Sequence, residues 1–160
     1  MDERELKEEA ERLGWTVKYL KSHLAKEDRI EKVFDRLEDE KIVKKFKEKY
    51  GEDEIAIVFA NRSSSLTFDQ KHLDLYKSGE TSPAIFVYTL PNICVGEICI
   101  KNRIFGENLF FVLEEFDLEF LKDQAYLLLE TTDAKCVLLG WVESFEEKMD
   151  GVFLIIEKDN

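Results

Sequence analysis

The chain has 160 residues, 44% of them apolar, which is enough for a single domain with its own hydrophobic core. It carries 35 acidic and 23 basic side chains, and the resulting formal charge of −12 repels nucleic acid. The N-terminal segment is charged from its second residue, and no apolar run approaches the roughly 20 residues that span a bilayer. We therefore expect one cytoplasmic domain whose partners are neither nucleic acids nor membranes.

Residues 1–50 are strongly charged and helix-forming. Gly14 and Gly51 stand where helices are expected to end. The basic cluster at 41–49 is interleaved with acidic residues, which is typical of a solvated helix face. We predict amphipathic helices that cover the rest of the domain, because apolar residues recur at roughly helical intervals: Leu20, Leu24, Ile30, Val33, Phe34, Leu37, Ile42, Val43 and Phe46.

The next elements alternate between strand and helix. Residues 54–60 form a continuous run of β-branched and aromatic side chains, which predicts a strand covered on both faces. A loop with three serines follows, and then a short helical piece around residues 70–76. Pro91 predicts the first turn of a helix over 91–102.

The last third of the chain is richer in strands. Residues 108–114 and 134–144 are strand-like, and an amphipathic helix is expected between them, over 116–133. Gly151 indicates a turn before a last strand at 151–158. The order β, α, β, α, β, β predicts an α/β domain, in which a mixed sheet of about four strands carries flanking helices.

Three pieces of the chain carry a resemblance to a known family. They are the segment "SPAIFVYTLPN" at 82–92, the pair "GEICI" and "FGEN" at 96–108, and the strand "LLGWVES" at 138–144. Together they resemble the N-terminal half of the β-ketoacyl-acyl-carrier-protein synthases of the thiolase superfamily. The resemblance implies a truncated thiolase-like half-domain over 54–158, within a single domain of 1–160 in which residues 1–50 are an added cover. It is greatest to short synthase-like proteins of bacterial pigment and polyene lipid biosynthesis.

In this family a nucleophilic cysteine follows the strand that corresponds to residues 108–114. Here the place reads "VLEEFDLEF", with Glu115 at the position of the cysteine, or Glu114 if the register shifts by one. Neither carboxylate can form the acyl thioester that begins condensation. The two active-site histidines of the family belong to its C-terminal half, and His23 and His72 match neither. The resemblance therefore implies a protein without catalytic residues, cofactor or metal.

Glu114 and Glu115 allow two interpretations. Adjacent carboxylates in a dry cleft can serve as general acid and base, which would make the chain an acyl-thioester decarboxylase or hydrolase that uses Glu115. Alternatively, acidic side chains at the start of a helix stabilise its positive end. We favour the structural interpretation, and we also keep the possibility that the chain merely inherited the fold.

The cysteines and serines have structural explanations. Cys94, Cys99 and Cys136 are odd in number and lack C-x-x-C spacing, so we expect reduced, buried thiols instead of disulfides or a zinc site. The serines at 63–65 lack the surroundings of a nucleophile and fit a turn.

The resemblance also implies a mode of assembly, because in the family the strand before the nucleophile pairs with its mate across a dimer axis. The matching residues here are Phe110, Phe111 and Leu113. An uncovered apolar strand at a sheet edge invites aggregation, so we expect a homodimer or a heterodimer with a full-length synthase. Acyl carriers of this family are acidic, and the charge of −12 disfavours their docking. The expected function is that of a non-catalytic partner or scaffold in fatty-acid-like or polyketide-like biosynthesis.

Overall fold

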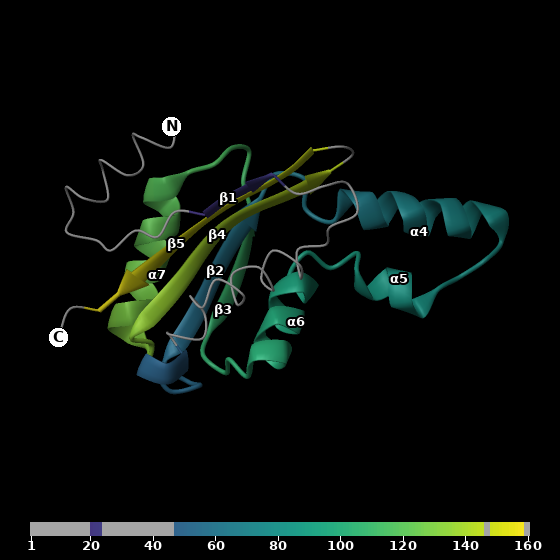
Figure 1. The fold of residues 1–160 in the computed structure, drawn as a ribbon. Coiled ribbons are helices and arrows are strands. Elements are labelled where there is room, and N and C mark those ends of the chain that lie inside the picture. Colours follow the sequence, from purple (N-terminus) through teal and green to yellow (C-terminus); the bar gives the residue numbers. More distant parts are fainter. Residues whose placement is uncertain (1–19, 24–46, 146–147, 159–160) are drawn as a thin grey trace.

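The computed structural model describes residues 20–23, 47–145 and 148–158. It contains a five-stranded mixed sheet in the order β1-β5-β4-β2-β3 (Figure 1). The strands are β1 Leu20–His23, β2 Ile55–Asn61, β3 Asn108–Val112, β4 Cys136–Phe145 and β5 Lys148–Glu157. The helices are α4 Leu66–Ser78, α5 Pro83–Val87, α6 Ile93–Asn102 and α7 Leu118–Thr131. None of these helices is long and apolar enough to cross a lipid bilayer.

Strands β4, β2 and β3 are parallel to one another. β2 pairs with β3 on one side and with β4 on the other, while β5 runs antiparallel to β4 and β1 antiparallel to β5. Every residue of β2 is buried, because the strand has neighbours at both edges and a helix against each face. The predicted α/β architecture is confirmed. The predicted strands that correspond to β2, β3 and β4, which the helical connections join, are confirmed as well.

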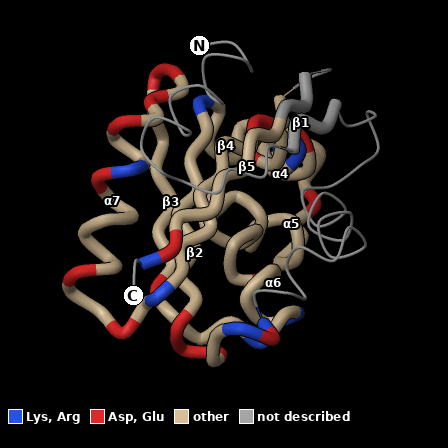
Figure 2. Tube along the Cα trace, turned by 60° about the vertical axis from the view of Figure 1, so that its left-hand side comes forward, with Lys and Arg blue, Asp and Glu red and all other residues tan. Residues whose placement is uncertain are grey.

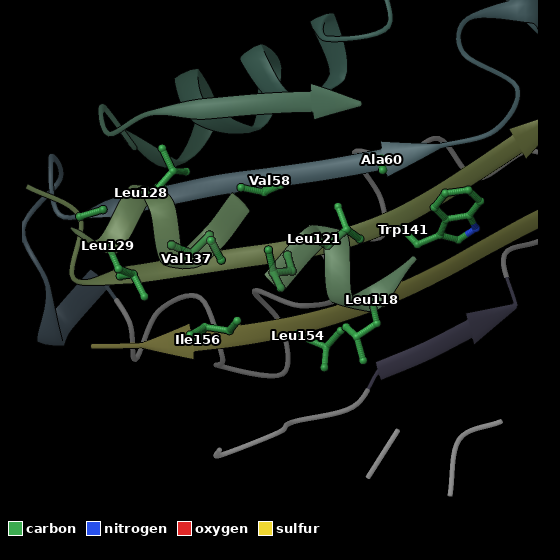
Figure 3. Close-up of a cluster of buried hydrophobic side chains, with 14 of the residues drawn as sticks. Val58, Ala60, Leu118, Leu121, Leu128, Leu129, Val137, Trp141, Leu154 and Ile156 are labelled. Atoms are coloured by element: carbon green, nitrogen blue, oxygen red, sulfur yellow. The ribbon is translucent and has the colours of Figure 1, made fainter. Parts of the chain in front are cut away.

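Helix α7 covers one face of the sheet. Its leucines pack against the alternate residues of β2, β4 and β5 that point to this side, as Figure 3 shows for Val58, Val137 and Leu154. The helix begins after Asp117, whose carboxylate accepts a hydrogen bond from Phe120 N at 2.9 Å. Its opposite side carries exposed acidic residues, so the predicted amphipathic pattern is confirmed.

Helix α6 covers the other face. Val95, Ile98 and Cys99 pack in one cluster with Phe59 of β2 and Phe153 of β5. The two phenylalanine rings meet edge to face, with centroids 5.6 Å apart. A Cβ atom at Gly140 of β4 would stand 2.6 Å from Phe59 Cδ1, so this glycine makes room for the ring. The sheet therefore has a packed layer on both sides.

The sheet has one strand more than predicted. Leu20 to His23 were expected in a helix but pair with Phe153 to Asp150 of β5 as strand β1. This pairing satisfies the backbone groups on the outer edge of β5, an advantage that local helix propensity does not include. The helices predicted over 1–19 and 24–46 lie outside the described residues.

Two further local predictions were wrong. Gly151 does not form a turn but lies inside β5 opposite Val142, because the β4–β5 pairing continues to Phe145 and Lys148. Pro91 precedes α6 instead of lying in its first turn, since Asn92 is the N-cap and the helix begins at Ile93.

The connection between β2 and α6 is more helical than predicted. Helix α4 extends four residues before and two after the predicted piece at 70–76, and α5 was not predicted. Ser82 caps α5 by accepting a hydrogen bond from Ile85 N at 3.3 Å, and Pro83 is the first helical residue. The Ser-Pro pair was therefore a usable sequence signal for this helix.

We call residues 62–92, which include α4 and α5, the arm. In Figure 1 both helices extend beyond the sheet instead of covering either of its faces. The helices pack on each other through Phe68 and Tyr88, stacked with centroids 5.1 Å apart, and through His72 and Phe86 at 5.6 Å. No residue of either helix is buried.

Candidate functional site

The candidate site is the carboxyl edge of the parallel strands. Because β2, β3 and β4 run in the same direction, the segments that follow them meet at one edge of the sheet. Residues 62–65, 113–117 and 143–145 are these segments or lie at the strand ends. In open α/β sheets this edge is where ligands and reacting groups are bound.

Glu114 and Glu115 lie in the bend between β3 and α7, and both are exposed. We expected them at the beginning of the helix, but α7 begins at Leu118 and its N-cap is Asp117. The helix-capping role therefore belongs to Asp117. A pair of carboxylates tuned as acid and base needs a dry surrounding, and two exposed side chains lack it.

A different glutamate organises this edge. The carboxylate of Glu143, near the end of β4, accepts hydrogen bonds from the backbone N–H groups of Arg62 at 2.8 Å and Ser63 at 3.3 Å. The hydroxyl group of Ser63 also donates to it. Three donors on one carboxylate hold the start of the arm against β4. Glu143 thus acts as an anchor for the loop.

Asn61 shapes the same loop from inside. Its side-chain oxygen accepts from Ser64 N at 2.9 Å, and its amide donates to Ser64 O at 2.8 Å. Ser64 has a φ of 52°, in the left-handed region, and this pair of bonds holds it there. The serines therefore have turn roles, as expected from their sequence.

Sequence reasoning did not identify Asn61 and Glu143 as functional residues. Glu143 is part of the quoted segment "LLGWVES", so the resemblance marked its position without giving it a role. The partners of Glu143 are about 80 residues away along the chain, and no local pattern connects them.

The thiols are not at this edge. Cys136 is the first residue of β4, at the opposite end of the sheet, while Cys94 and Cys99 belong to α6. All three are free, and burial raises the pKa of Cys94 and Cys136 to about 12 and that of Cys99 to about 11. Such thiols are almost entirely protonated at neutral pH and are weak nucleophiles.

The histidines and acidic residues form no metal site in the described part of the chain. His72 lies on α4, where its ring packs against Phe86, and His23 lies in β1. No group of three or more His, Cys, Asp or Glu side chains among the described residues is arranged to hold a metal ion.

Among the strands of the described residues, β3 pairs only with β2 and lies at the edge of the sheet. Ile57 N donates to Glu107 O at 3.0 Å and Leu113 N to Asn61 O at 2.9 Å. In a parallel ladder of this register the odd-numbered residues from 107 to 113 point their backbone groups at β2. The backbone groups of Asn108, Phe110 and Val112 therefore point away from the sheet, where another strand could pair.

The side chains predicted to meet a dimer mate have different surroundings. Phe110 belongs to the α6 side of the sheet, whereas Phe111 and Leu113 pack against the α7 side. The Phe111 ring meets Phe120 of α7 edge to face, with centroids 4.9 Å apart. Val112 has 52% of its surface exposed and is the apolar side chain of this strand that is most available to a partner.

Acidic residues dominate the surface beside β3. Glu114, Glu115 and Asp117 precede α7, and Figure 2 shows further acidic positions along that helix. This distribution places part of the excess negative charge next to the carboxyl edge.

Comparisons with known proteins agree with this fold. No family model and no curated protein sequence matches the chain. Among solved structures, the ketosynthase ApeO in complex with its chain length factor ApeC from Xenorhabdus doucetiae is similar, with a TM-score of 0.61 and 17% identity, over 74% of this chain and 54% of that chain. The ishigamide ketosynthase/chain length factor gives a TM-score of 0.58 and 16% identity, over 66% and 36%.

The chain thus spans about half of one matching protein and about a third of the other. The likeness shows that the described sheet and its helices have the ketosynthase-like, thiolase-type fold that the sequence motifs predicted.

Proposed function

We propose that this chain is a non-catalytic ketosynthase-like protein that serves as partner or scaffold for a full-length synthase in fatty-acid-like or polyketide-like biosynthesis, such as that of pigments or polyene lipids. The observation that carries the proposal is the carboxyl edge after β3. The resemblance aligns Glu115, or Glu114 if the register shifts by one, with the nucleophile of the family; both glutamates are exposed, and the three thiols lie in other elements.

The outer edge of β3, with which no strand of the described residues pairs, supports a role as a partner. Its outward backbone groups offer hydrogen bonds to an added strand, and Val112 offers an exposed apolar side chain beside them. One of the similar solved structures is itself a complex between a ketosynthase and a chain length factor. A full-length synthase would be the occupant of this edge.

The first test concerns chemistry. The protein is incubated with malonyl and acyl carrier thioesters, and products are followed by intact mass spectrometry. We expect neither condensation nor a covalent acyl adduct, because no thiolate stands at the nucleophile position.

The same assay tests the alternative enzyme. Decarboxylation or thioester hydrolysis that disappears in Glu115→Gln and persists in Glu114→Gln would replace our proposal by an acyl-thioester decarboxylase or hydrolase. The exposure of Glu115 argues against this outcome, since a solvated carboxylate is a weak general base.

The second test concerns assembly. The chain is purified from its native cell, and whatever travels with it is identified; a full-length synthase is the expected companion. A carrier protein alone would favour the enzyme, and a second copy bound through β3 would replace the heterodimer by a homodimer.

The variant for this test is Val112→Pro. Proline removes an N–H group that points outward from β3, so pairing with an added strand should be lost while the ladder to β2 is kept. The matched control is Val112→Thr, which keeps both the N–H group and the β-branched shape. Phe111→Lys is less informative, because it would also remove the contact with Phe120 inside the chain.

A further inference from the structure

The arm carries an apolar stripe that the proposed function does not use. Leu66, Leu73 and Tyr76 are seven and three residues apart on α4, and this spacing places them on one side of the helix. All three are exposed, with Leu73 at 48% and Tyr76 at 71%. We call them the Leu73 stripe.

The direction of this stripe is determined by contacts on the opposite side of α4. Phe68 and His72 pack against Tyr88 and Phe86, so this side of the helix is occupied within the arm. Leu66 and Leu73 lie about 160° and 140° around the helix from Phe68 and therefore point away from α5. Tyr76 follows His72 by four residues and lies at the border between the stripe and the side that contacts α5. Helix α4 has 13 residues and no buried side chain, so packing against the rest of the chain contributes little to its stability. Covering the stripe would therefore stabilise the helix.

The charge of the arm indicates what can cover the stripe. Residues 62–92 contain three basic and three acidic side chains, so the arm has no formal net charge and the rest of the chain carries the whole charge of −12. Two copies of an acidic protein repel each other least where the contacting segment is neutral. A surface that binds its own copy must also be complementary to itself.

The stripe meets this condition. If two α4 helices pair antiparallel about a two-fold axis at Leu73, each residue faces the one at the same distance on the other side of Leu73. Lys77 of each copy then faces Asp69 of the other, four residues from the axis in opposite directions. Tyr76 faces Gln70 in the same way. The arrangement has an apolar centre, two ion pairs and two polar contacts.

We infer that the Leu73 stripe is a self-association surface, which pairs α4 of one copy antiparallel with α4 of a second copy of this chain. The inference uses a surface other than the edge of β3 and does not depend on the proposed function. It would join two copies of the chain while leaving β3 available to a synthase.

The first experiment is sedimentation velocity of the full chain alone over a range of concentrations. The parent should show a reversible monomer–dimer equilibrium. Leu73→Glu would bring two carboxylates together at the two-fold axis and should raise the dimer Kd by at least about 100-fold. The matched control is Leu127→Glu on α7, where the leucine is 51% exposed, and its Kd should be unchanged.

The second experiment is a charge exchange between Asp69 and Lys77. Each single variant, Asp69→Lys or Lys77→Glu, places like charges opposite each other and should raise Kd about tenfold. The double variant restores opposite charges across the axis and should return Kd to within about threefold of the parent. A circular dichroism melt of each variant checks that the fold is kept.

Three results would overturn the inference. One is a parent that stays monomeric at the highest concentration reached. Another is a dimer that survives Leu73→Glu but dissociates with Val112→Pro, which would assign self-association to the β3 edge. The last is a double charge variant as weak as either single variant, since that would exclude the antiparallel pairing about Leu73.

Discussion

Strand β2 and the arm that follows it both carry apolar side chains, yet their environments are opposite. Every residue of β2 is buried, whereas no residue of α4 or α5 is. The strand has hydrogen-bonded neighbours at both edges and a helix against each face, while the two helices of the arm have mainly each other. Apolar content therefore stabilises the domain in one region and remains available for association in the other.

Thiol labelling should show the largest difference, between the sheet and the beginning of α6, the helix that follows the arm. Cys136 lies in the sheet, and its labelling in the native protein should be at least about 1,000-fold slower than in the denatured protein, because access needs extensive opening. Cys94, half-buried where the arm joins α6, should react faster than Cys136.

Burial raises the pKa of both thiols to about 12, so a difference in their native rates would report access and not acidity. Mass spectrometry of the two peptides after timed alkylation measures these rates. Equal native rates would mean that β4 and the beginning of α6 open together.

Removal of one aromatic ring from each region should give the next largest effect. Phe59→Ala empties a site between α6 and the sheet and should lower the free energy of unfolding by about 3–5 kcal/mol. Phe86→Ala in the arm, where the ring is 55% exposed, should cost less than about 1 kcal/mol. Urea unfolding of both variants measures the difference, and similar losses would show that the arm contributes to the core.

Adding a single methyl group tests packing more finely. Gly140→Ala would place a Cβ 2.6 Å from Phe59 Cδ1 and should destabilise the protein by about 1–3 kcal/mol. Gly96 in α6 has nothing within 4 Å of the same position, so Gly96→Ala should be neutral or stabilise by up to about 1 kcal/mol. Thermal melts of both variants make the comparison, and a stable Gly140→Ala protein would contradict the packing around Phe59.

The smallest effect concerns a charge at the margin of the sheet. Hydrogen bonds from Lys135 and from Gly51 N hold the pKa of Glu54 below its ordinary value of 4.5. A lowered pKa in the folded state stabilises the protein above the unfolded pKa, and this contribution is lost as the pH falls through the folded value.

Glu54→Gln should therefore be slightly less stable than the parent at neutral pH and equal to it in strong acid. Glu80→Gln, which removes an exposed carboxylate from the arm, is the matched control. Urea midpoints across the acidic pH range would show the convergence, and a constant difference would exclude the ionised Glu54 as its source.

Elements with a local, repeated signal were predictable from the amino-acid sequence alone. The unbroken apolar run of β2 predicted a strand covered on both faces, and the mixture of apolar and charged residues in α7 predicted an amphipathic helix. The motifs from Ser82 to Ser144 resemble those of the β-ketoacyl synthases, and this resemblance predicted the ketosynthase-like fold.

Features that depend on residues distant in sequence followed from the complete fold. Leu20 to His23 form a strand because they pair with the outer edge of β5, and Gly151 lies within β5 because β4 continues beside it. Glu143 anchors the arm through partners some 80 residues away, and among the described strands β3 is the last of the sheet, with β2 as its neighbour. Propensity acts between adjacent residues, whereas hydrogen bonding and burial are completed across the whole fold.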